Sequence, residues 1–114
     1  MNERRKFKRR LLVYNLEVFD AESNEPMGRM VDITPEGMML VAARPIDVNS
    51  MLHLSVELPS EIFGTKHVNF TGIAHWCRHD INPDLFDIGL EFTDITDKNI
   101  ETVIGLIADY AFPD

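Results

Sequence analysis

Two short segments of the sequence contain residue types that can bind a phosphate or a nucleobase. The first ten residues hold six basic side chains, among them Arg5 and Arg9 at a spacing of four. A guanidinium can pair with a phosphate through two parallel hydrogen bonds, can pair with guanine O6 and N7, and can stack on a base. This basic arm is therefore a candidate for binding an anion or a guanine, and the alternative is a solvated tail.

The second segment is DITPEG, residues 32–37, between two strand-like stretches. The Asp32 carboxylate can accept hydrogen bonds from the N1–H and N2–H₂ edge of guanine, and the Thr34 hydroxyl adds a polar contact. Gly37 lets the backbone approach a ligand closely. The alternative is an ordinary turn in which Asp32 or Thr34 bonds nearby amides and Gly37 supplies a positive φ. The arm and the turn would together reach the phosphates and both edges of a guanine.

The charge distribution limits the kind of anion that can bind. Residues 1–10 hold six basic and one acidic side chain, a net of +5, whereas the other 104 residues hold five basic and 18 acidic, a net of −13, which gives the total of −8. An acidic body would repel a long polyanion. General nucleic-acid binding is therefore not expected, and a small anion with few phosphates remains compatible.

The rest of the chain reads as strands followed by a helix. Apolar residues alternate with polar ones near residues 12–18, 52–58, 67–79 and 86–92, and residues 27–33 and 37–42 read as two further strands on either side of a tight turn. This period of two predicts strands, with Pro59 closing the fourth. The six strands predict a mainly β protein built as a small antiparallel barrel.

The pattern changes to a helical period after Thr96. Apolar residues at 100, 103, 104, 107 and 110 would share one face of a helix over about 97–110, with Thr96 as the N-cap and Asp97 in the first turn. We expect this face to pack on the barrel, and a partner or dimer surface is the alternative.

At this level the sequence resembles the PilZ domain family of bacteria. RKFKR (5–9) is similar to the family's RxxxR, DITPEG to its [DN]xSxxG, and GIAHWCRHD followed by FDIGLEFTDI to its closing pair of strands. The resemblance implies a six-stranded antiparallel Greek-key or split barrel with a C-terminal helix. It also implies cyclic di-GMP, a second messenger with two guanines and two phosphates, as the ligand.

The resemblance further implies roles for individual residues. Arg5 and Arg9 would bind guanine and phosphate, Asp32 and the Thr34 hydroxyl would contact guanine, and Gly37 would permit close approach. Thr34 replaces the family's serine, so the hydroxyl is kept and a methyl group is added. Further candidates for the site are Arg4 and Arg10, which flank the arm motif, and Gly89 on the outer face of the sixth strand.

Other residue groups indicate no catalysis and no metal site. Carboxylates such as Asp80, Asp84 and Asp87 accompany no pattern of nucleophile and base. Three potential ligands, His75, Cys77 and His79, share one parity of the fifth strand, but the polar outer face of a barrel explains them more simply than a metal does. Trp76 falls on the inward parity and is expected in the core, with a wall of the ligand site as the alternative.

The sequence thus predicts a cytoplasmic, non-enzymatic receptor with no cofactor apart from its ligand and no membrane span. Cyclic di-GMP would order a flexible arm, residues 1–10, against a single barrel domain, residues 11–114, and so change the surface offered to a partner protein. Motility, exopolysaccharide and adhesion machinery are the possible partners on family grounds. The alternatives are an interaction module that binds no nucleotide and a barrel that binds single-stranded nucleic acid.

Overall fold

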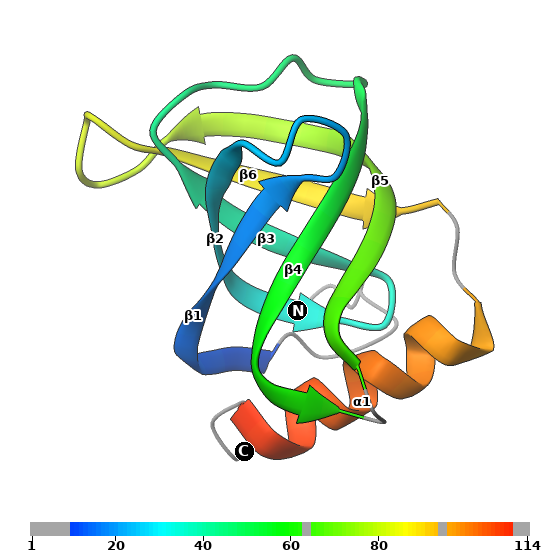
Figure 1. The fold of residues 1–114 in the computed structure, drawn as a ribbon. Coiled ribbons are helices and arrows are strands. Elements are labelled where there is room, and N and C mark those ends of the chain that lie inside the picture. Colours follow the sequence, from blue (N-terminus) through cyan, green and yellow to red (C-terminus); the bar gives the residue numbers. More distant parts are fainter. Residues whose placement is uncertain (1–9, 63–64, 94–95, 111–114) are drawn as a thin grey trace, which may run out of the picture.

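The computed structural model describes residues 10–62, 65–93 and 96–110 (Figure 1). The elements are β1 (Arg10–Asp20), β2 (Pro26–Thr34), β3 (Gly37–Ala42), β4 (Met51–Ile62), β5 (Thr65–His79), β6 (Phe86–Phe92) and α1 (Asp97–Tyr110). Each strand pairs antiparallel with its neighbours, and the order β1-β2-β3-β6-β5-β4 closes into a barrel. The predicted six-stranded antiparallel barrel is confirmed.

The connection after β3 determines this strand order. Residues 43–50 cross one end of the barrel, so that β4 lies beside β1 (Figure 1). The second neighbour of β3, after β2, is therefore β6. As a consequence, the turn between β2 and β3 lies next to the end of β6. Segments that are about 55 residues apart in the sequence thereby share one surface.

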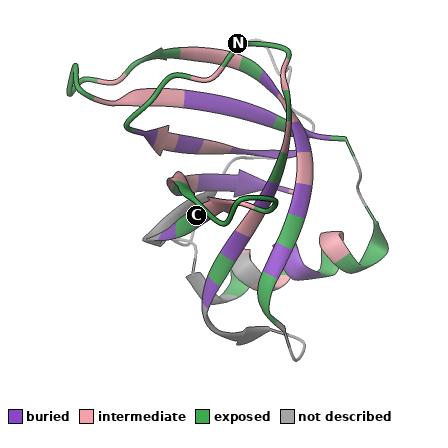
Figure 2. Ribbon diagram, turned by 45° about the horizontal axis from the view of Figure 1, so that its top comes forward, coloured by how far each residue is buried: buried purple, intermediate pink, exposed green. Residues whose placement is uncertain are grey.

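The barrel interior is filled by the inward parity of every strand, and buried and exposed residues alternate along the strands (Figure 2). At its centre the rings of Phe70 and Phe92 stack with centroids 4.6 Å apart. The largest fully buried strand side chains are Val18, Met30, Ile33, Leu40, Leu54, Val56, Leu58 and Ile88. This packed interior leaves any ligand site to the outer surface or the ends.

Pro59 does not end β4, contrary to the sequence prediction. The strand continues to Ile62, and its pairing with β5 is interrupted between Glu57 and Ile62. Proline has no N–H to give to a strand ladder, so it is tolerated where the pairing is irregular.

An extra residue in β2 decides which of its side chains reach the outer surface. Met30 pairs with Leu40 of β3, and the next pair is Asp32 with Met39, so Val31 has no partner of its own on β3. One extra residue turns every following side chain to the opposite face of the sheet. Asp32 therefore faces outward although the buried Met30, two residues earlier, faces inward.

The helix α1 has the predicted bounds and the predicted cap, but its buried face is rotated. Thr96 Oγ1 accepts a hydrogen bond from the Asn99 N–H at 3.1 Å. Thr102 and Val103 face the barrel, where α1 lies across the end formed by β1, β2, β4 and β5. Ile104 is 56% exposed, so its assignment to the packed face was wrong. A helix can place only about a third of its circumference against the barrel end. Thr102 occupies part of that buried face, and its hydroxyl donates a hydrogen bond to the Lys98 carbonyl.

Within the described residues, α1 is too short and too polar to span a membrane.

Candidate functional site

The turn between β2 and β3 is organised by the hydroxyl of Thr34. Its Oγ1 accepts hydrogen bonds from the backbone N–H of Glu36 at 3.0 Å and of Gly37 at 3.1 Å. Thr34 is buried, so both bonds satisfy amides that water reaches poorly. The structure therefore supports the turn-forming role of Thr34. The hydroxyl hydrogen is used by neither bond, which leaves Thr34 a donor for a ligand.

Gly37 is required by the close approach of β3 to β6. A Cβ atom on Gly37 would overlap the carbonyl oxygen of Leu90 and lie 3.3 Å from the Cα of Glu91. Its φ is outside the left-handed region, so the positive φ that the alternative turn interpretation assigned to Gly37 is not present. Because Gly37 has no side chain, the turn can pack closely against β6. The Phe92 N–H donates a hydrogen bond to the Glu36 carbonyl across this contact at 2.8 Å.

Asp32 is 5% exposed although it lies on the outer side of the barrel. Its backbone pairs with Met39 on one side and with Leu11 of β1 on the other. A carboxylate in so enclosed a position is dehydrated, which makes it a stronger acceptor for a directed N–H donor than an exposed carboxylate would be.

Of the predicted arm, the structure describes only the last residue, Arg10. Arg10 begins β1 and pairs with Ile33, so the described chain starts beside the strand that carries Asp32. The other three arginines predicted for the site, Arg4, Arg5 and Arg9, lie outside the described residues.

Asp32 belongs to a row of cross-strand neighbours on the outer surface. It pairs with Met39 of β3, Met39 pairs with Gly89 of β6, and Gly89 pairs with Trp76 of β5. A hollow of about 400 Å³ lies over this row. Residues lining it include all four site residues predicted within the barrel, namely Asp32, Thr34, Gly37 and Gly89.

Trp76 lines the hollow and is not in the core, contrary to its sequence assignment. Ala74 of β5 pairs with Leu90, and the next pair is Trp76 with Gly89, so His75 is an extra residue. Trp76 is thereby turned outward. The alternative prediction for Trp76, a wall of the candidate site, agrees with its position.

The indole of Trp76 occupies the space that a side chain at Gly89 would fill. A Cβ atom on Gly89 would overlap Cε2 and Nε1 of the indole. The guanidinium of Arg78 lies over the indole ring, with its Cζ atom 4.5 Å from the centroid. Among the described residues, the exposed guanidinium of Arg78 lies on one face of the ring.

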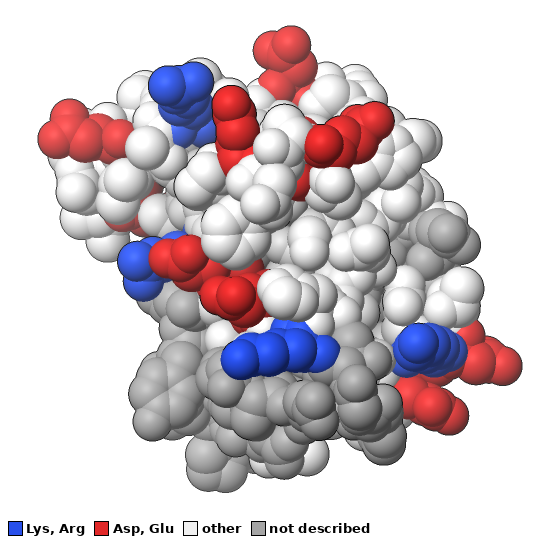
Figure 3. Space-filling model, viewed as in Figure 1, with Lys and Arg blue, Asp and Glu red and all other residues white. Residues whose placement is uncertain are grey.

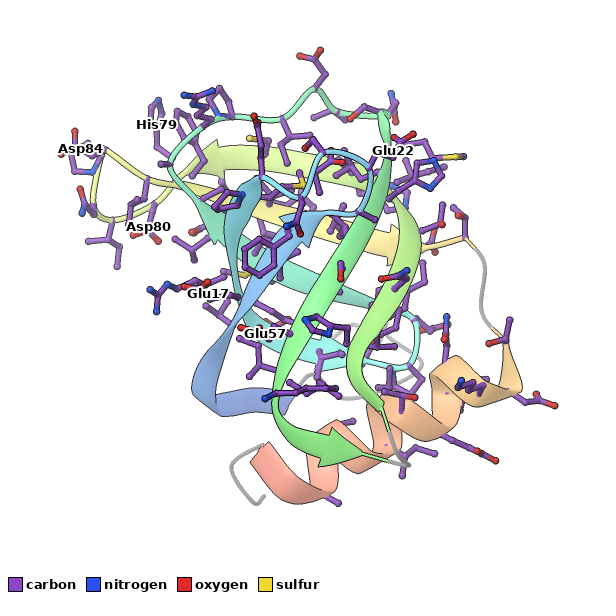
Figure 4. All side chains as sticks on the ribbon, viewed as in Figure 1. Glu17, Glu22, Glu57, His79, Asp80 and Asp84 are labelled. Atoms are coloured by element: carbon purple, nitrogen blue, oxygen red, sulfur yellow. The ribbon has the colours of Figure 1, made fainter. Side chains whose placement is uncertain are left out.

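A pair of carboxyl groups adjoins Arg78 at the far edge of the hollow. Asp87 is the cross-strand partner of Arg78, and Asp80 follows β5 at the start of the loop seen in Figure 4. Burial and the neighbouring Asp80 raise the pKa of Asp87, against the smaller opposing effect of Arg78. The backbone N–H of Asn82 and a hydrogen bond with Asp87 lower the pKa of Asp80. As the pH rises, Asp80 therefore ionises first and Asp87 keeps its proton longer.

The three potential metal ligands of β5 do not share a face. The extra residue at His75 turns Cys77 toward the core, while His75 contacts Glu91 and His79 packs on Phe86. In the part of the chain that the structure describes, no three His, Cys, Asp or Glu side chains are grouped to hold a metal ion. The parity predicted for all three residues was wrong, because the bulge takes His75 off the face that Cys77 and His79 share.

The charges around the hollow suit a base better than a phosphate. Its described residues include three carboxylates, of Asp32, Glu36 and Glu91, against the guanidinium of Arg78 and the imidazole of His75. On the face drawn in Figure 3, the described lysines and arginines are scattered singly among acidic side chains. A phosphate at this hollow would need cations from elsewhere, and the basic arm is the densest source in the sequence.

Comparison with known proteins agrees with this architecture. The sequence matches the PilZ domain family over residues 3–109, and the chain belongs to that family. No curated protein matches the sequence. One similar solved structure is that of the Bacillus subtilis inhibitor of motility, MotI/DgrA, with a TM-score of 0.72 and 18% sequence identity. The match covers 94% of this chain and 51% of that one, so this chain spans about half of its length.

A second solved structure is similar over nearly its whole length. It is the PilZ domain with c-di-GMP of YcgR from Escherichia coli, with a TM-score of 0.67 and 13% identity. The match covers 94% of each chain. Both likenesses establish a shared fold.

Sequence reasoning did not assign to the site seven of the residues that line the hollow: Glu36, Met38, Met39, His75, Arg78, Leu90 and Glu91. The sequence could have indicated Glu91, because it lies two residues after Gly89 and so shares the outer face of β6 with it. Arg78 had none, since its direction depends on the extra residue in β5.

Proposed function

We propose that this protein is a non-enzymatic receptor for cyclic di-GMP, which binds in the hollow over the Asp32–Trp76 row. The observation that carries the proposal is that the enclosed Asp32 carboxylate and the Thr34 turn line one hollow together with Gly89 and Trp76. Membership of the PilZ family supports the choice of ligand, as does the likeness to the YcgR domain, whose structure is titled with c-di-GMP.

In this proposal the barrel recognises guanine and the arm neutralises phosphate. Asp32 accepts hydrogen bonds from the N1–H and N2–H₂ groups of one guanine, and the Thr34 hydroxyl donates to the ligand. Arg5 and Arg9 pair with the phosphates and the guanine O6/N7 edge, and Arg4 and Arg10 add positive charge. The arm supplies what the hollow lacks, since the described residues around it carry more carboxylates than cations.

Binding would fix the arm beside Asp32, because β1 begins there. The arm and the ligand would then cover the acidic surface around the hollow, and a partner protein could distinguish the covered surface from the open one. Such a receptor would act in the cytoplasm. Motility machinery is the first class of partner to test, because one structural neighbour is named an inhibitor of motility.

Calorimetric titration with cyclic di-GMP tests the proposal. The wild-type protein should bind at micromolar concentration, and Arg9→Ala should weaken binding at least tenfold, since a charged hydrogen bond contributes about 1.5–3 kcal/mol. Arg29→Ala is the matched control, because it removes one positive charge from an exposed pair with Glu17 outside the hollow. Absence of heat with the wild type would refute the proposal, and equal affinities of both variants would refute the role of the arm.

A further inference from the structure

A second groove lies at the end of the barrel opposite α1, between the start of β2 and the connection from β3 to β4 (Figure 1). Its volume is about 600 Å³, and most of the residues that line it are apolar: Pro26, Met27, Ala43, Pro45 and Ile46. The charged residues Glu25 and Arg44 complete the lining. None of these residues lines the hollow, so the groove is a separate feature of the surface.

The apolar surface continues beyond the groove along the same connection. Val48 is 47% exposed, and Met51 at the start of β4 is 57% exposed. Residues 43–50 cross this end of the barrel, so both side chains follow the groove along one loop (Figure 1). Large apolar side chains exposed beside an apolar groove indicate a surface that binds another molecule.

Hydrogen bonds fix the shape of both loops that form this end. Asp20 Oδ1 accepts hydrogen bonds from the backbone N–H of Glu22 at 2.8 Å and of Ser23 at 3.0 Å. In the other loop, Ser50 Oγ donates a hydrogen bond to the Asp47 carbonyl at 2.6 Å. Loops that are already held in place lose little conformational freedom when a partner binds.

The charges at this end are mostly negative. Residues 20–27 and 43–51 hold one cation, Arg44, and four carboxylates, those of Asp20, Glu22, Glu25 and Asp47. Acidic side chains surround this end of the molecule, at the top of the view in Figure 3. Such a rim attracts lysine and arginine, and it repels nucleic acids and anionic lipid surfaces. A partner that fits this end is therefore basic as well as apolar.

The closure of the barrel limits the form of the partner. In the part of the chain that the structure describes, the six strands form a closed sheet, so none of them is an edge strand to which a peptide could add. A helix forms its own backbone hydrogen bonds and presents apolar side chains at spacings of three and four. A helix that lies along residues 43–51 could place one turn in the groove and a later turn against Val48 and Met51.

The helix α1 of a second copy does not have the required charge. Its residues 97–110 include one basic side chain, Lys98, and three acidic ones, Asp97, Glu101 and Asp109. The acidic rim would repel such a helix.

We propose that residues 21–27 and 43–51 form a docking surface for a basic amphipathic helix of another protein. Aliphatic side chains of that helix enter the groove, and its lysines and arginines face Glu22, Glu25 and Asp47. The surface is separate from the hollow and needs no nucleotide, so it goes beyond the proposed function.

The test uses a synthetic helix of about 18 residues, long enough to be helical when bound, with leucines at spacings of three and four and lysines elsewhere. The control peptide has glutamate in place of every lysine. Binding is measured by fluorescence anisotropy of the labelled peptides and is located by NMR of the ¹⁵N-labelled protein. The leucine–lysine peptide should bind at micromolar concentration and shift the amide signals of residues 21–27 and 43–51. The leucine–glutamate peptide should bind at least about tenfold more weakly.

Matched variants separate this surface from general attraction to an acidic protein. The double variant Val48→Ser, Met51→Ser should weaken binding about fivefold or more, because it removes two exposed apolar side chains from the surface. Ile104→Ser is the control, since Ile104 is 56% exposed but lies on α1 at the opposite end. Glu25→Lys should weaken binding about threefold or more, whereas Glu57→Lys, on the front of the barrel in Figure 4, should change it by less than about twofold.

Shifted signals over the hollow or α1 in place of residues 21–27 and 43–51 would overturn the proposal. Equal binding of the two peptides, or unchanged affinity of the double variant, would do the same. Sedimentation of the protein alone tests for a second copy on this surface: a dimer that the double variant abolishes would overturn the choice of another protein as the occupant. No nucleotide is present in these experiments, so their failure leaves the proposed receptor function standing, and failure of cyclic di-GMP binding leaves the docking surface standing.

Discussion

The indole of Trp76 lies against the backbone of Gly89, at a position of β6 where any other residue would project a side chain into the ring. The contact joins two residues that are directly paired across β5 and β6. It fixes the orientation of Trp76 and forms the floor of the hollow. Gly89 thus contributes to the candidate site by leaving room for the indole of Trp76.

Gly89→Ala should displace the indole and destabilise the protein by about 1–3 kcal/mol, the usual cost of overpacking. Trp76 emission should shift to longer wavelength as the ring moves into water. In a Trp76→Ala background the same change should be neutral or stabilising by about 0.5–1 kcal/mol, because glycine weakens a strand when no ring needs the space. Urea unfolding of the four proteins measures this coupling, and equal costs in both backgrounds would contradict the contact.

Thr34→Ala should destabilise the protein by about 1–3 kcal/mol, because the backbone N–H groups of Glu36 and Gly37 lose their acceptor. Thr34→Ser is the matched control, since it keeps the hydroxyl and loses one methyl group, which is worth about 0.8 kcal/mol. Chemical denaturation measures both. The serine variant should also bind cyclic di-GMP at least as tightly as the wild type; weaker binding would show that the methyl group assists the ligand.

Asp87→Asn should make the protein relatively more stable as the pH rises. The folded pKa of Asp87 is raised above its ordinary value, so the folded state holds this proton more tightly than the unfolded chain. That contribution is present below the ordinary pKa and is lost as the pH rises through the folded value. Asparagine has no proton to lose.

Denaturation at several values between about pH 4 and pH 7 tests this dependence. The gain over the wild type should reach less than about 1 kcal/mol, since the group is only partly buried. Asp84→Asn is the control, because Asp84 is exposed at the tip of the same loop (Figure 4). A stability difference that does not change with pH would argue against a raised pKa of Asp87.

Val103→Ala should cost about 2 kcal/mol, because Val103 is 1% exposed against the barrel end. Ile104→Ala should change stability by less than about 0.5 kcal/mol, since its side chain faces water. The two positions are adjacent in one helix, so thermal unfolding of the pair compares the two faces directly. A larger loss of stability for Ile104→Ala than for Val103→Ala would show that Ile104 lies on the packed face of the helix, as the apolar spacing predicted.

Elements whose side chains follow one uninterrupted period could be predicted from the sequence. Phe86, Ile88, Leu90 and Phe92 of β6 alternate without interruption, and the last three lie in the core. The helix bounds and the Thr96 cap followed from local signals as well. The β2–β3 turn was also recognisable, because its hydroxyl and its glycine act within four residues.

The sequence by itself determined the strands, the barrel, the helix, and the four barrel residues of the candidate site. Only the tertiary structure decided the direction of Trp76 and Arg78, the separation of His75 from the face that Cys77 and His79 share, and the exposure of Ile104. The physical reason is that an extra residue in a strand is defined by its partner strand. His75 is extra because Ala74 and Trp76 pair with the adjacent Leu90 and Gly89, a relationship that β5 alone does not contain.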